Sequence, residues 1–325
     1  MKEMSASEAL RHGIRLEMKR DDRIFVLGED ARDRGGPFGI YKGLLEEFGP
    51  KRVVDTPISE AAIVGTAIGA AVTGLRPIAM LGFNDFFGVC MDQIMNQAAK
   101  MRYMFGGKIQ LPLVLQATKG AGFSAAAHHS QSLEALCLHI PGLKVVIPSG
   151  PNEAAGLIRS AIRDNNPVVY LIDKVVLARM KEEVPEEAEP IPLGQAKVHR
   201  PGENLTIVAW GTMVSVAMNS VEALQELGVD PEIIDLRTIS PMDLDTVVDS
   251  VSKTNRLVIL HEACRTGGAG GTLASLVMER AFDDLDSPIK VVGAPDTPVP
   301  YSPVLEKFFL PDVENVVKAV RGMVG

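Results

Sequence analysis

Short apolar runs alternate along the chain with segments whose apolar residues recur at helical spacing. In the first half, the apolar runs predict strands at residues 23–27, 52–55, 77–81, 113–117, 144–147 and 168–172. The segments between them predict helices at residues 5–19, 41–48, 61–74, 83–101, 132–139 and 152–164. Strands that alternate with helices in this way are typical of a doubly wound, largely parallel sheet. The segment 61–74 consists almost entirely of small or apolar residues, which predicts a buried helix.

The pattern changes at residues 181–192, where the sequence KEEVPEEAEPIP is acidic, rich in proline and without periodicity. Beyond it the alternation resumes, with strands predicted at 205–209, 232–235, 257–260 and 289–292 and helices at 214–227, 243–251, 269–282 and 313–320. A length of 325 residues also suggests about two domains. We therefore predict an α/β protein of two doubly wound domains, residues 1–185 and 200–325, joined by an acidic, proline-rich linker at 186–199.

Composition and charge argue against several classes of function. The chain is 46% hydrophobic and carries a formal charge of −8, which disfavours a surface for nucleic acid or anionic membranes. Its longest apolar stretches are too short or too interrupted to span a bilayer, which takes about 20 residues. The mixed charge of the first residues predicts an amphipathic helix rather than a secretory signal. Three widely separated cysteines without a CxxC pair indicate a reducing, cytoplasmic location and no zinc site.

The stretch DTPISE, residues 55–60, joins a predicted strand to the buried helix. Pro57 has no amide hydrogen and ends the strand, and Ser59 is a good N-cap for the helix. Glu60 is therefore expected at the carboxyl edge of the sheet, where ligands bind in open α/β proteins. Two interpretations of Glu60 remain at this point. It complements the dipole of the helix, or it contacts a ligand.

Two further segments are expected at the same edge of the sheet. The sequence AAAHHSQ places His128 and His129 in a loop after the strand at 113–117, and a histidine in such a loop can titrate near neutral pH. The sequence FNDFF, residues 83–87, follows the strand at 77–81. These histidines are either functional or ordinary surface residues, and the aromatic residues form either a wall for a flat ligand or part of the core. The turn TGG at 266–268 either cradles an anion or serves close packing.

Several stretches together carry a family resemblance. They are DTPISEAAIVGTAIGAAVTGLRP (55–77), MDQIMNQAAKMRYMFGG (91–107), HHSQSLEALCLHIPGLKVV (128–146), SAIRDNNPVV (160–169) and GAPDTPVPYSPVLE (293–306). With them the chain resembles the β subunit of the thiamine-diphosphate-dependent first enzyme of 2-oxo acid dehydrogenase complexes. The resemblance implies an N-terminal pyrimidine-binding domain of the thiamine-diphosphate fold and a C-terminal domain like that of transketolase. The stretches MRYMFGG and APDTPVPYSP resemble the acetoin and pyruvate types, whereas HEA at 261–263 with TGG at 266–268 resembles the branched-chain type.

The resemblance assigns roles to individual residues. Glu60 matches the glutamate that hydrogen-bonds the aminopyrimidine ring of the cofactor and promotes its activation. Phe86 matches the aromatic residue beside that ring, and Gly82 and Ile58 fall among the residues that line the cofactor. His129 matches an active-site histidine that stabilises intermediates and assists acyl transfer to a lipoyl group. The resemblance thus makes Glu60 and His129 the expected catalytic residues.

A loop near residue 164 resembles the potassium-binding loop of the family. The oxygen ligands that this resemblance implies come from Leu113, Ala161, Ile162, Asp164 and Asn166. Most are carbonyl oxygens, which suit a hard cation. A plain Asp–Asn turn after a helix is the alternative interpretation.

The sequence lacks the Gly-Asp-Gly motif, with a following asparagine, by which this cofactor class holds magnesium and diphosphate. The chain is therefore expected to supply only the pyrimidine half of the site, with Mg²⁺ and the diphosphate held by a separate α subunit. The resemblance implies a heterotetramer of two α and two β chains, a contact between the two β subunits, and a lipoyl acyltransferase core as a further partner. The implied substrate is a small 2-oxo acid or acetoin, and the implied activity is its decarboxylation or cleavage with reductive acylation of the lipoyl group.

Three positions depart from the family pattern. His128 stands where relatives commonly have glutamine, Met80 where many have glutamate, and Gly82 where pyruvate-type relatives have methionine. These departures suggest the alternative of a non-catalytic scaffold or regulatory subunit. A separate alternative, which the identity of the α chain would decide, is a subunit of a transketolase-type enzyme that works without a lipoyl partner. The presence of Glu60 argues against the scaffold, which has no need of that carboxylate.

Overall fold

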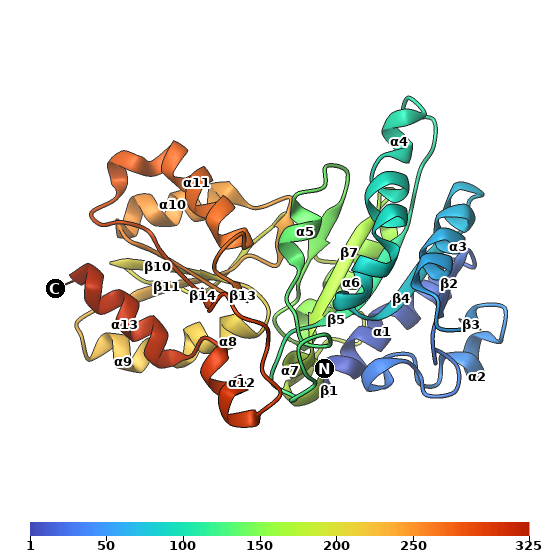
Figure 1. The fold of residues 1–325 in the computed structure, drawn as a ribbon, viewed down its shortest axis with the longest axis horizontal. Coiled ribbons are helices and arrows are strands. Elements are labelled where there is room, and N and C mark those ends of the chain that lie inside the picture. The colour runs from blue at the N-terminus through green and yellow to red at the C-terminus, as the bar shows by residue number, and fades with distance from the viewer. Residues whose placement is uncertain (325) are drawn as a thin grey trace.

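The computed structural model describes residues 1–324, which fold into two adjoining domains (Figure 1). The N-terminal domain is built on a sheet of seven strands in the order β12-β6-β7-β5-β4-β2-β3. These strands are β2 (Ile24–Gly28), β3 (Val53–Asp55), β4 (Arg76–Phe83), β5 (Val114–Lys119), β6 (Lys144–Val146), β7 (Val168–Asp173) and β12 (Thr238–Ser240). All neighbours pair in parallel except β12, which runs antiparallel to β6.

Helices cover both faces of this sheet, which confirms the doubly wound architecture predicted from the sequence. The first face packs against α1 (Ala6–Arg20) and α6 (Pro151–Arg163). The opposite face packs against α3 (Glu60–Val72), the helical segment from Asn84 to Met104, and α5 (Glu134–Leu138). The strands are buried on both faces, as parallel sheets generally are. Shorter elements of this domain are η1 (Pro37–Gly39), α2 (Leu44–Phe48) and α7 (Lys174–Arg179).

The C-terminal domain has a five-stranded sheet in the order β14-β13-β10-β11-β9. Its strands are β9 (Lys197–Arg200), β10 (Leu205–Ala209), β11 (Pro231–Asp235), β13 (Leu257–Cys264) and β14 (Lys290–Ala294), and only β9 is antiparallel to its neighbour. On one face lie α8 (Thr212–Asn219), α9 (Val221–Gln225) and α13 (Val313–Val324), and on the other α10 (Leu244–Thr254) and α11 (Ala269–Ala281). The turn η4 (Phe282–Asp284) follows α11, and α12 (Pro303–Phe309) precedes α13.

The two domains share more structure than the sequence predicts. Strand β12 belongs to the C-terminal half of the chain but completes the N-terminal sheet beside β6. One hydrophobic core runs from α3 and α5 through Trp210 to α10 and α11. The boundary placed at residues 186–199 is therefore crossed by both backbone pairing and side-chain packing.

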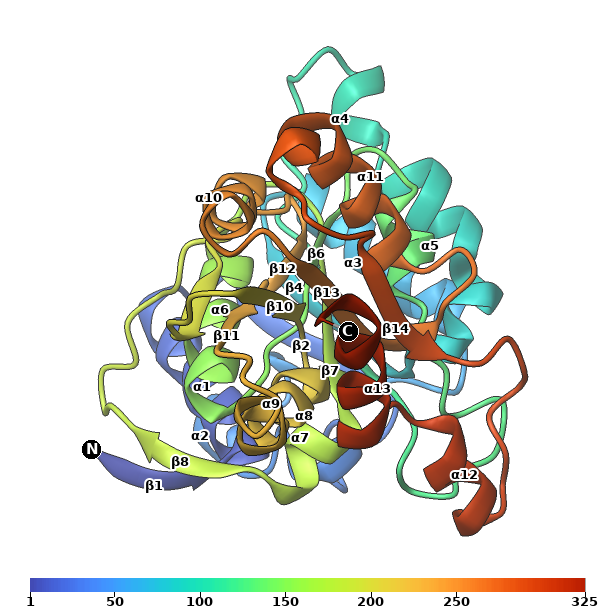
Figure 2. The same cartoon turned by 90° about the vertical axis from the view of Figure 1, so that its left-hand side faces the viewer.

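The structure corrects the start of the acidic stretch 181–192 and the end of the predicted linker 186–199. Residues Lys181–Val184, which the acidic pattern assigned to an irregular stretch, form β8, and β8 pairs antiparallel with β1 (Lys2–Ser5). Figure 2 shows these two strands side by side at one edge of the molecule. The last residues of the predicted linker belong to β9 and so to the second sheet. The irregular connection is thus confined to residues 185–196.

Two segments, each predicted as one helix, are divided in the structure. The segment predicted as one helix at 83–101 is a 3₁₀ segment (Asn84–Cys90), a π-helical turn (Gln93–Ala98) and the short α4 (Met101–Met104) that projects from the domain in Figure 1. The Asn84 side chain bonds the backbone of Gln131 and Leu133, which ties the start of this segment to a neighbouring loop. The helix predicted at 214–227 is interrupted at Ser220, whose hydroxyl bonds the carbonyl of Ala217.

The helix predicted to be buried, α3, is buried on one face only. Ile63, Val64 and Ala67 are in the core, whereas Ala62 and Thr66 face solvent. The helix carries apolar residues on all its faces, but this chain covers only one of those faces. Among residues 1–324, no helix combines the length and apolarity that crossing a bilayer requires.

Candidate active site

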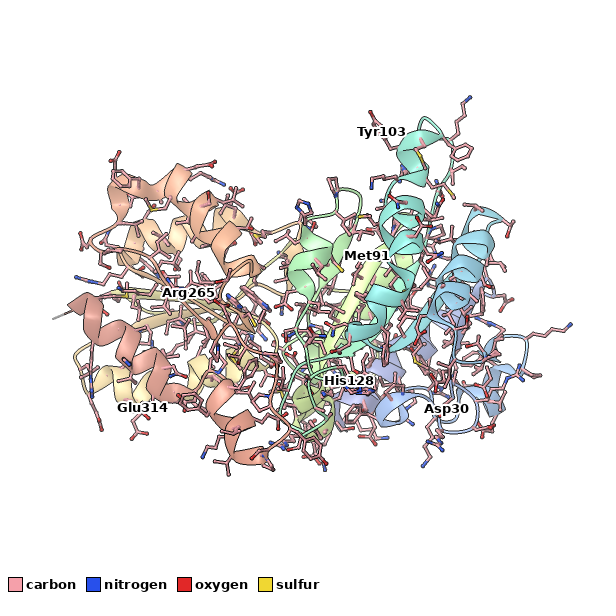
Figure 3. All side chains as sticks on the ribbon, in the orientation of Figure 1. Asp30, Met91, Tyr103, His128, Arg265 and Glu314 are labelled. Atoms are coloured by element: carbon pink, nitrogen blue, oxygen red, sulfur yellow. The ribbon has the colours of Figure 1, made fainter. Side chains whose placement is uncertain are left out.

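A pocket of about 590 Å³ opens at the carboxyl edge of the N-terminal sheet. It lies where β2, β3, β4 and β5 end, next to the point at which the strand order reverses direction. This is the position at which doubly wound sheets bind ligands. The pocket is lined by Glu29, Asp30, Arg34, Gly36, Pro37, Ile58, Glu60, Met80, Gly82, Phe83, Phe86, Val89 and His129. Asp30 and His128, the neighbour of His129, lie along the same side of the domain in Figure 3.

Glu60 is the first residue of α3, and its half-buried carboxylate lines the pocket. Ser59 occupies the N-cap position as predicted, although its side chain makes no capping hydrogen bond. Within residues 1–324, no protein group hydrogen-bonds the carboxylate of Glu60. A carboxylate at the mouth of a pocket without a protein partner is available to a ligand.

Glu29 and Asp30 place further negative charge beside Glu60. Partial burial raises the pKa of the Glu29 carboxyl, and the nearby carboxylates of Asp30 and Glu60 raise it further. Arg34 offsets part of this charge, since its Nε lies 3.6 Å from Asp30. This wall of the pocket therefore favours a ligand that presents a protonated or hydrogen-bond-donating group.

The opposite wall is aromatic and holds His129. The imidazole of His129 meets the ring of Phe83 edge to face at a centroid distance of 4.8 Å and that of Phe86 at 5.4 Å. The ammonium group of Lys174 donates a hydrogen bond to the carbonyl oxygen of His129 and lies 5.6 Å from the centre of the Phe83 ring. Burial lowers the pKa of Lys174. These contacts fix both the backbone and the ring of His129.

The floor of the pocket is open at Gly82. A Cβ atom added there would meet no other atom within 4 Å, so the glycine leaves room that a larger residue would fill. Met80 is buried beneath the pocket, and Ile58 is 74% exposed at its rim. The structure therefore brings Glu60, His129, Phe86, Gly82 and Ile58 into one pocket, and the roles assigned to them from the sequence stay predictions.

His128 lies outside this pocket, although its ring is only 4.3 Å from that of His129. It lines a neighbouring cavity together with Gln131, Cys264 and Asp296, between the two domains. The residues of the main pocket that sequence reasoning did not assign include Glu29 and Asp30, whereas Phe83 belongs to the segment 83–87 that was considered as an aromatic wall. The available signal for the acidic pair was its position directly after the first strand of the sheet.

The loop that resembles a potassium site already contains two cationic side chains. The guanidinium of Arg76 donates to the carbonyl oxygens of Ile162, at 3.0 Å, and Asp164, at 2.7 Å. The carboxylate of Asp164 pairs with Lys144 and accepts two hydrogen bonds from Asn166. A carbonyl oxygen has two lone pairs, so one acceptor position remains on each of the two carbonyls. The oxygen atoms of this loop are thus suitable ligands for a hard cation, but Arg76 already binds two of them.

The predicted potassium ligands lie around this loop in the fold. Ala161 and Ile162 are buried in the last turn of α6, and Asp164 follows that helix. The carbonyl oxygen of Leu113 accepts a hydrogen bond from the amide of Val168.

The glycine turn at 266–268 is explained by packing. A Cβ atom at Gly268 or Gly270 would lie 2.6 Å from the buried ring of His261. The Thr266 backbone amide and hydroxyl bond the carboxylate of Asp296. Of the two interpretations of this turn, the structure favours close packing.

Comparison with family models matches both domains. Residues 2–178 match the model described as "Transketolase, pyrimidine binding domain". Residues 194–316 match the model described as "Transketolase, C-terminal domain". Together the two matches cover nearly the whole chain.

Full-length relatives come from several 2-oxo acid and acetoin enzymes. The chain is 47% identical to the acetoin:2,6-dichlorophenolindophenol oxidoreductase subunit beta of Bacillus subtilis, over 99% of this chain and 97% of that protein. It is 46% identical to the pyruvate dehydrogenase E1 component subunit beta of Rickettsia felis, over 98% of each chain. It is 40% identical to the 2-oxoisovalerate dehydrogenase subunit beta of Bacillus subtilis, over 99% of this chain and 98% of that protein.

Among solved structures, the chain is similar to one described as a split gene transketolase in the form of an inactive beta4 tetramer. The TM-score is 0.80, the sequences are 22% identical, and the match covers 98% of each chain. At this identity the likeness shows a common fold.

Proposed function

Because the chain belongs to the family of β subunits of the first component of 2-oxo acid dehydrogenase complexes, we propose that it is the β subunit of a thiamine-diphosphate-dependent 2-oxo acid or acetoin dehydrogenase. In this function the assembled enzyme decarboxylates or cleaves its substrate and reductively acylates a lipoyl group on a partner acyltransferase. When bound, thiamine diphosphate supplies the nucleophilic carbon and the electron sink that this chemistry requires.

One observation carries the proposal. The pocket at the switch point of the sheet sets the unpartnered carboxylate of Glu60 opposite the aromatic wall of Phe86 and His129, above the open floor at Gly82. A flat aminopyrimidine needs an aromatic or apolar wall, space for its ring and a carboxylate at one ring nitrogen. All three features are present in a single pocket.

The residues of this chain have distinct tasks in the proposed reaction. Glu60 accepts a hydrogen bond from the protonated ring nitrogen of the aminopyrimidine and stabilises that protonated form, helped by the negative charge of Glu29 and Asp30. Phe86 and Phe83 support the flat face of the ligand and the imidazole of His129. His129 is positioned to donate or accept a proton at the reacting atoms beyond the ring.

The site is completed by another chain. The sequence lacks the Gly-Asp-Gly motif, with a following asparagine, by which this cofactor class holds magnesium and diphosphate. We propose that an α subunit provides the Mg²⁺ and diphosphate half, and that two α and two β chains form the enzyme. The exposed face of α3 has the small residues that permit close contact with another subunit. All three cysteines are free thiols, which agrees with a proposed place in the cytoplasm.

The potassium site remains part of the proposal. The carbonyl oxygens near Asp164 are suitable ligands, and the second lone pairs of Ile162 and Asp164 are the positions that a potassium ion would use. Arg76 and Lys144 reduce the need for such an ion, because both already place positive charge at the loop.

Native mass spectrometry of the protein purified from its own cells tests this function. We expect a complex of two chains of 34.9 kDa with two chains of another mass, carrying thiamine diphosphate. The mass and activity of that second chain then identify the substrate branch. An assembly of this chain alone without cofactor would favour the scaffold function, and a second chain whose complex acts without a lipoyl acceptor would favour a transketolase-type enzyme.

A further inference from the structure

The histidine that lines the pocket is carried by a closed loop, residues 120–131. The amide of Gly120 donates to the carbonyl oxygen of Gln131 at 3.0 Å and closes the loop at its base. The Asp85 carboxylate accepts hydrogen bonds from the amide and side chain of Gln131, and Lys174 binds the carbonyl of His129. The base of the loop is therefore fixed by residues of the N-terminal domain.

The first part of the loop has a left-handed backbone at four residues, and two of them are strained. Gly120, Gly122, Ser124 and Ala126 all have positive φ angles, of 90°, 98°, 51° and 66°. For Ser124 and Ala126, which carry a Cβ atom, this left-handed conformation costs about 1 kcal/mol or more each. Such a conformation persists only where surrounding contacts impose it. The contacts made by this first part of the loop therefore determine its shape.

The backbone amides in this part of the loop donate to the C-terminal domain, through Glu306 on α12, while Arg179 of α7 donates to the carbonyl oxygen of Gly122 at 3.2 Å. Oε1 of Glu306 accepts from the amide of Gly122 at 2.8 Å, and the amide of Ser124 donates to both oxygens, at 2.9 Å to Oε2 and 3.1 Å to Oε1. The hydroxyl of Ser124 lies 3.3 Å from the second oxygen. Glu306 is only 4% exposed, and within residues 1–324 every hydrogen bond that its carboxylate accepts comes from this loop.

A second carboxylate of the same domain holds the adjoining residue. Glu262 at the end of β13 accepts from the amide of Ala121 at 2.7 Å. The amides of Ala121, Gly122 and Ser124 thus donate hydrogen bonds to two carboxylates, Glu262 and Glu306, that are remote from the loop in sequence. Of the two, Glu306 acts on the strained residues, which lie between the anchored base and His129.

We propose that Glu306 is a positioning residue that sets the shape of the loop 120–131 and thereby the place of the His129 imidazole. The proposal rests on the proposed function, in which His129 acts on the reacting atoms. In this arrangement the C-terminal domain controls the active site of the N-terminal domain without contacting the ligand. Small displacements of a catalytic group are costly, since an error of about 1 Å can reduce the rate about 100-fold.

The substitution Glu306→Gln tests the proposal with little change in volume. The amide oxygen can still accept from Gly122 and, at the longer distance, from Ser124, but the NH₂ group that replaces Oε2 then faces the amide of Ser124, and two donors repel each other. In the enzyme assembled with its α subunit, we expect kcat to fall at least 10-fold with little change in KM or in bound thiamine diphosphate. The matched control is Glu314→Gln on α13, an exposed glutamate outside the pocket, which should leave both constants unchanged.

A double variant separates positioning from a general structural role. If Glu306 acts through His129, then Glu306→Gln should cause little further loss in an enzyme that already carries His129→Ala. Fully additive losses, or unchanged kcat in the single variant, would overturn the proposal.

Hydrogen exchange gives a readout that does not depend on catalysis. In the wild-type chain we expect the amides of Gly122 and Ser124 to be protected, and in Glu306→Gln we expect faster exchange confined to residues 120–131, with β10 unaffected. Unprotected amides in the wild type would refute the contact even if the variant failed to fold. If the wild-type enzyme lacks 2-oxo acid or acetoin activity while the exchange pattern is as expected, the proposed function fails and the structural role of Glu306 stands.

Discussion

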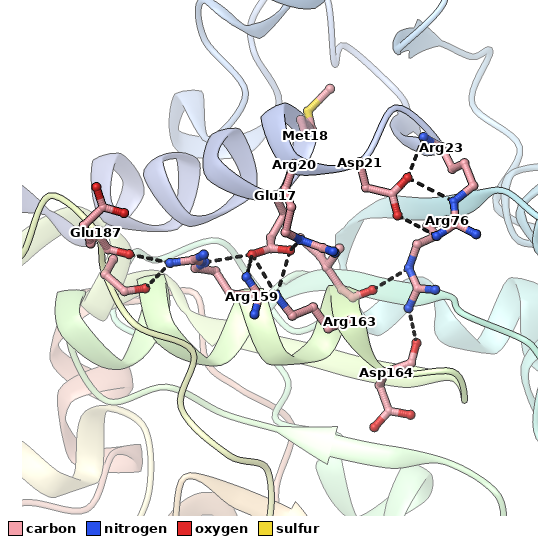
Figure 4. Close-up of polar contacts among 12 residues, drawn as sticks. Glu17, Met18, Arg20, Asp21, Arg23, Arg76, Arg159, Arg163, Asp164 and Glu187 are labelled. Carbon is pink, nitrogen blue, oxygen red and sulfur yellow. Dashed lines mark hydrogen bonds and ion pairs between the residues drawn. The ribbon is translucent and has the colours of Figure 1, made fainter.

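Arg76 and Asp164 meet at the end of α6, where a guanidinium nitrogen of Arg76 lies 2.7 Å from the carbonyl oxygen of Asp164 (Figure 4). The same guanidinium donates to the carbonyl of Ile162 and to the side chain of Asn165. Arg76 is buried, and it comes from the first residue of β4, far from this loop in sequence. A cation of the protein itself thus occupies a cluster of carbonyl oxygens for which the sequence suggested a potassium ion.

Replacing Arg76 with methionine should make the stability of the protein depend on potassium. The variant loses three donated hydrogen bonds, and we expect about 2 kcal/mol of destabilisation. The carbonyl oxygens left without a donor should then recruit a hard cation. The midpoint of thermal unfolding should therefore rise more in potassium chloride than in choline chloride at equal concentration, and more for Arg76→Met than for the wild type.

The control for this experiment is Arg280→Met, which removes an exposed ion pair with Asp245. It should change stability little and should respond equally to both salts. An equal response of Arg76→Met to the two salts would mean that the loop does not bind potassium even when its own cation is removed.

Glu17 forms a second buried charge cluster, on α1. Its carboxylate, which is fully buried, accepts from Arg159 at 2.8 Å, from Arg163 at 2.7 Å and from Arg20 at 2.6 Å (Figure 4). Burial acts to raise the pKa of Glu17, but the hydrogen bonds from the three arginines outweigh burial and hold the pKa below its ordinary value. The contacts join α1 to α6, which pack against each other on one face of the sheet.

The substitution Glu17→Gln should destabilise the protein by about 2 kcal/mol at neutral pH, because a buried neutral amide accepts weaker hydrogen bonds from the three arginines than the buried carboxylate does. A lowered pKa contributes stability above the unfolded value, and this contribution is lost as the pH falls through the folded value. The difference between variant and wild type in urea unfolding should thus shrink below about pH 4. Glu47→Gln, at a partly exposed pair with Arg15, is the control and should cost less than about 1 kcal/mol. An equal loss in the free energy of unfolding in the two variants would contradict the prediction that the Glu17 cluster stabilises the fold more than the Glu47 pair.

The sequence predicts the regular parts of this fold well, because buried parallel strands produce continuous apolar runs. Strand β10 has the predicted bounds, and α1, α6 and α10 differ from prediction only at their ends. Strand β12 has three residues, too few for a pattern, and its partner β6 lies in the other half of the chain. Its position depends on how the two domains pack, which local sequence does not encode.

In the candidate site, too, some features follow from local sequence and others depend on distant contacts. Glu60, Gly82 and His129 each follow a predicted strand, so the topology of a parallel sheet brings them to one edge. The contacts that hold the site in shape were not predictable in this way. Glu306 is 182 residues from Ser124 in sequence, and no periodicity or motif indicates that the two meet. The partial exposure of α3 was missed for a related reason, since an apolar composition does not reveal whether the covering surface belongs to the same chain.

Glu262 should make the protein less stable as the pH rises. Burial raises the pKa of this carboxyl to about 7, and the like charges of Asp173 and Glu134 add to the effect against the opposing charge of Lys119. Between about pH 4.5 and pH 7 the folded state keeps a proton that the unfolded state releases, so stability falls as the pH rises through this range. The shift corresponds to roughly 3 kcal/mol.

The substitution Glu262→Gln removes this titration while it keeps an oxygen that can accept from the amide of Ala121. We expect the free energy of unfolding of the variant to vary much less between pH 5 and pH 8 than that of the wild type, as measured by denaturant titration at each pH. The gain of the variant should be largest at the alkaline end. A wild-type profile that is flat over this range would show that Glu262 is ionised in the folded protein.

Glu60→Gln should abolish turnover without disturbing assembly. The amide has the size of the carboxylate, and the carboxylate has no hydrogen-bond partner among residues 1–324, so the fold and the contact with the α subunit should persist. The variant loses the negative charge that favours a protonated ring nitrogen. The stabilisation of a protonated group by a positioned side chain is worth about 100-fold or more in rate. The same variant should lower the pKa of Glu29, because one of the like charges that raise it is gone.

Steady-state kinetics of the assembled enzyme, with native mass spectrometry of the same sample, measures both effects of Glu60→Gln. Glu46→Gln on α2 is the matched control, since Glu46 is exposed and does not line the pocket. Glu29→Gln distinguishes two explanations for a loss of rate. If the pocket requires only negative charge, Glu29→Gln should reduce kcat as strongly as Glu60→Gln. If the carboxylate acts by a specific hydrogen bond to the ring, Glu60→Gln alone should be nearly inactive. Near-normal turnover of Glu60→Gln would remove Glu60 from the reaction and favour the scaffold function, because its carboxylate then has no other evident use.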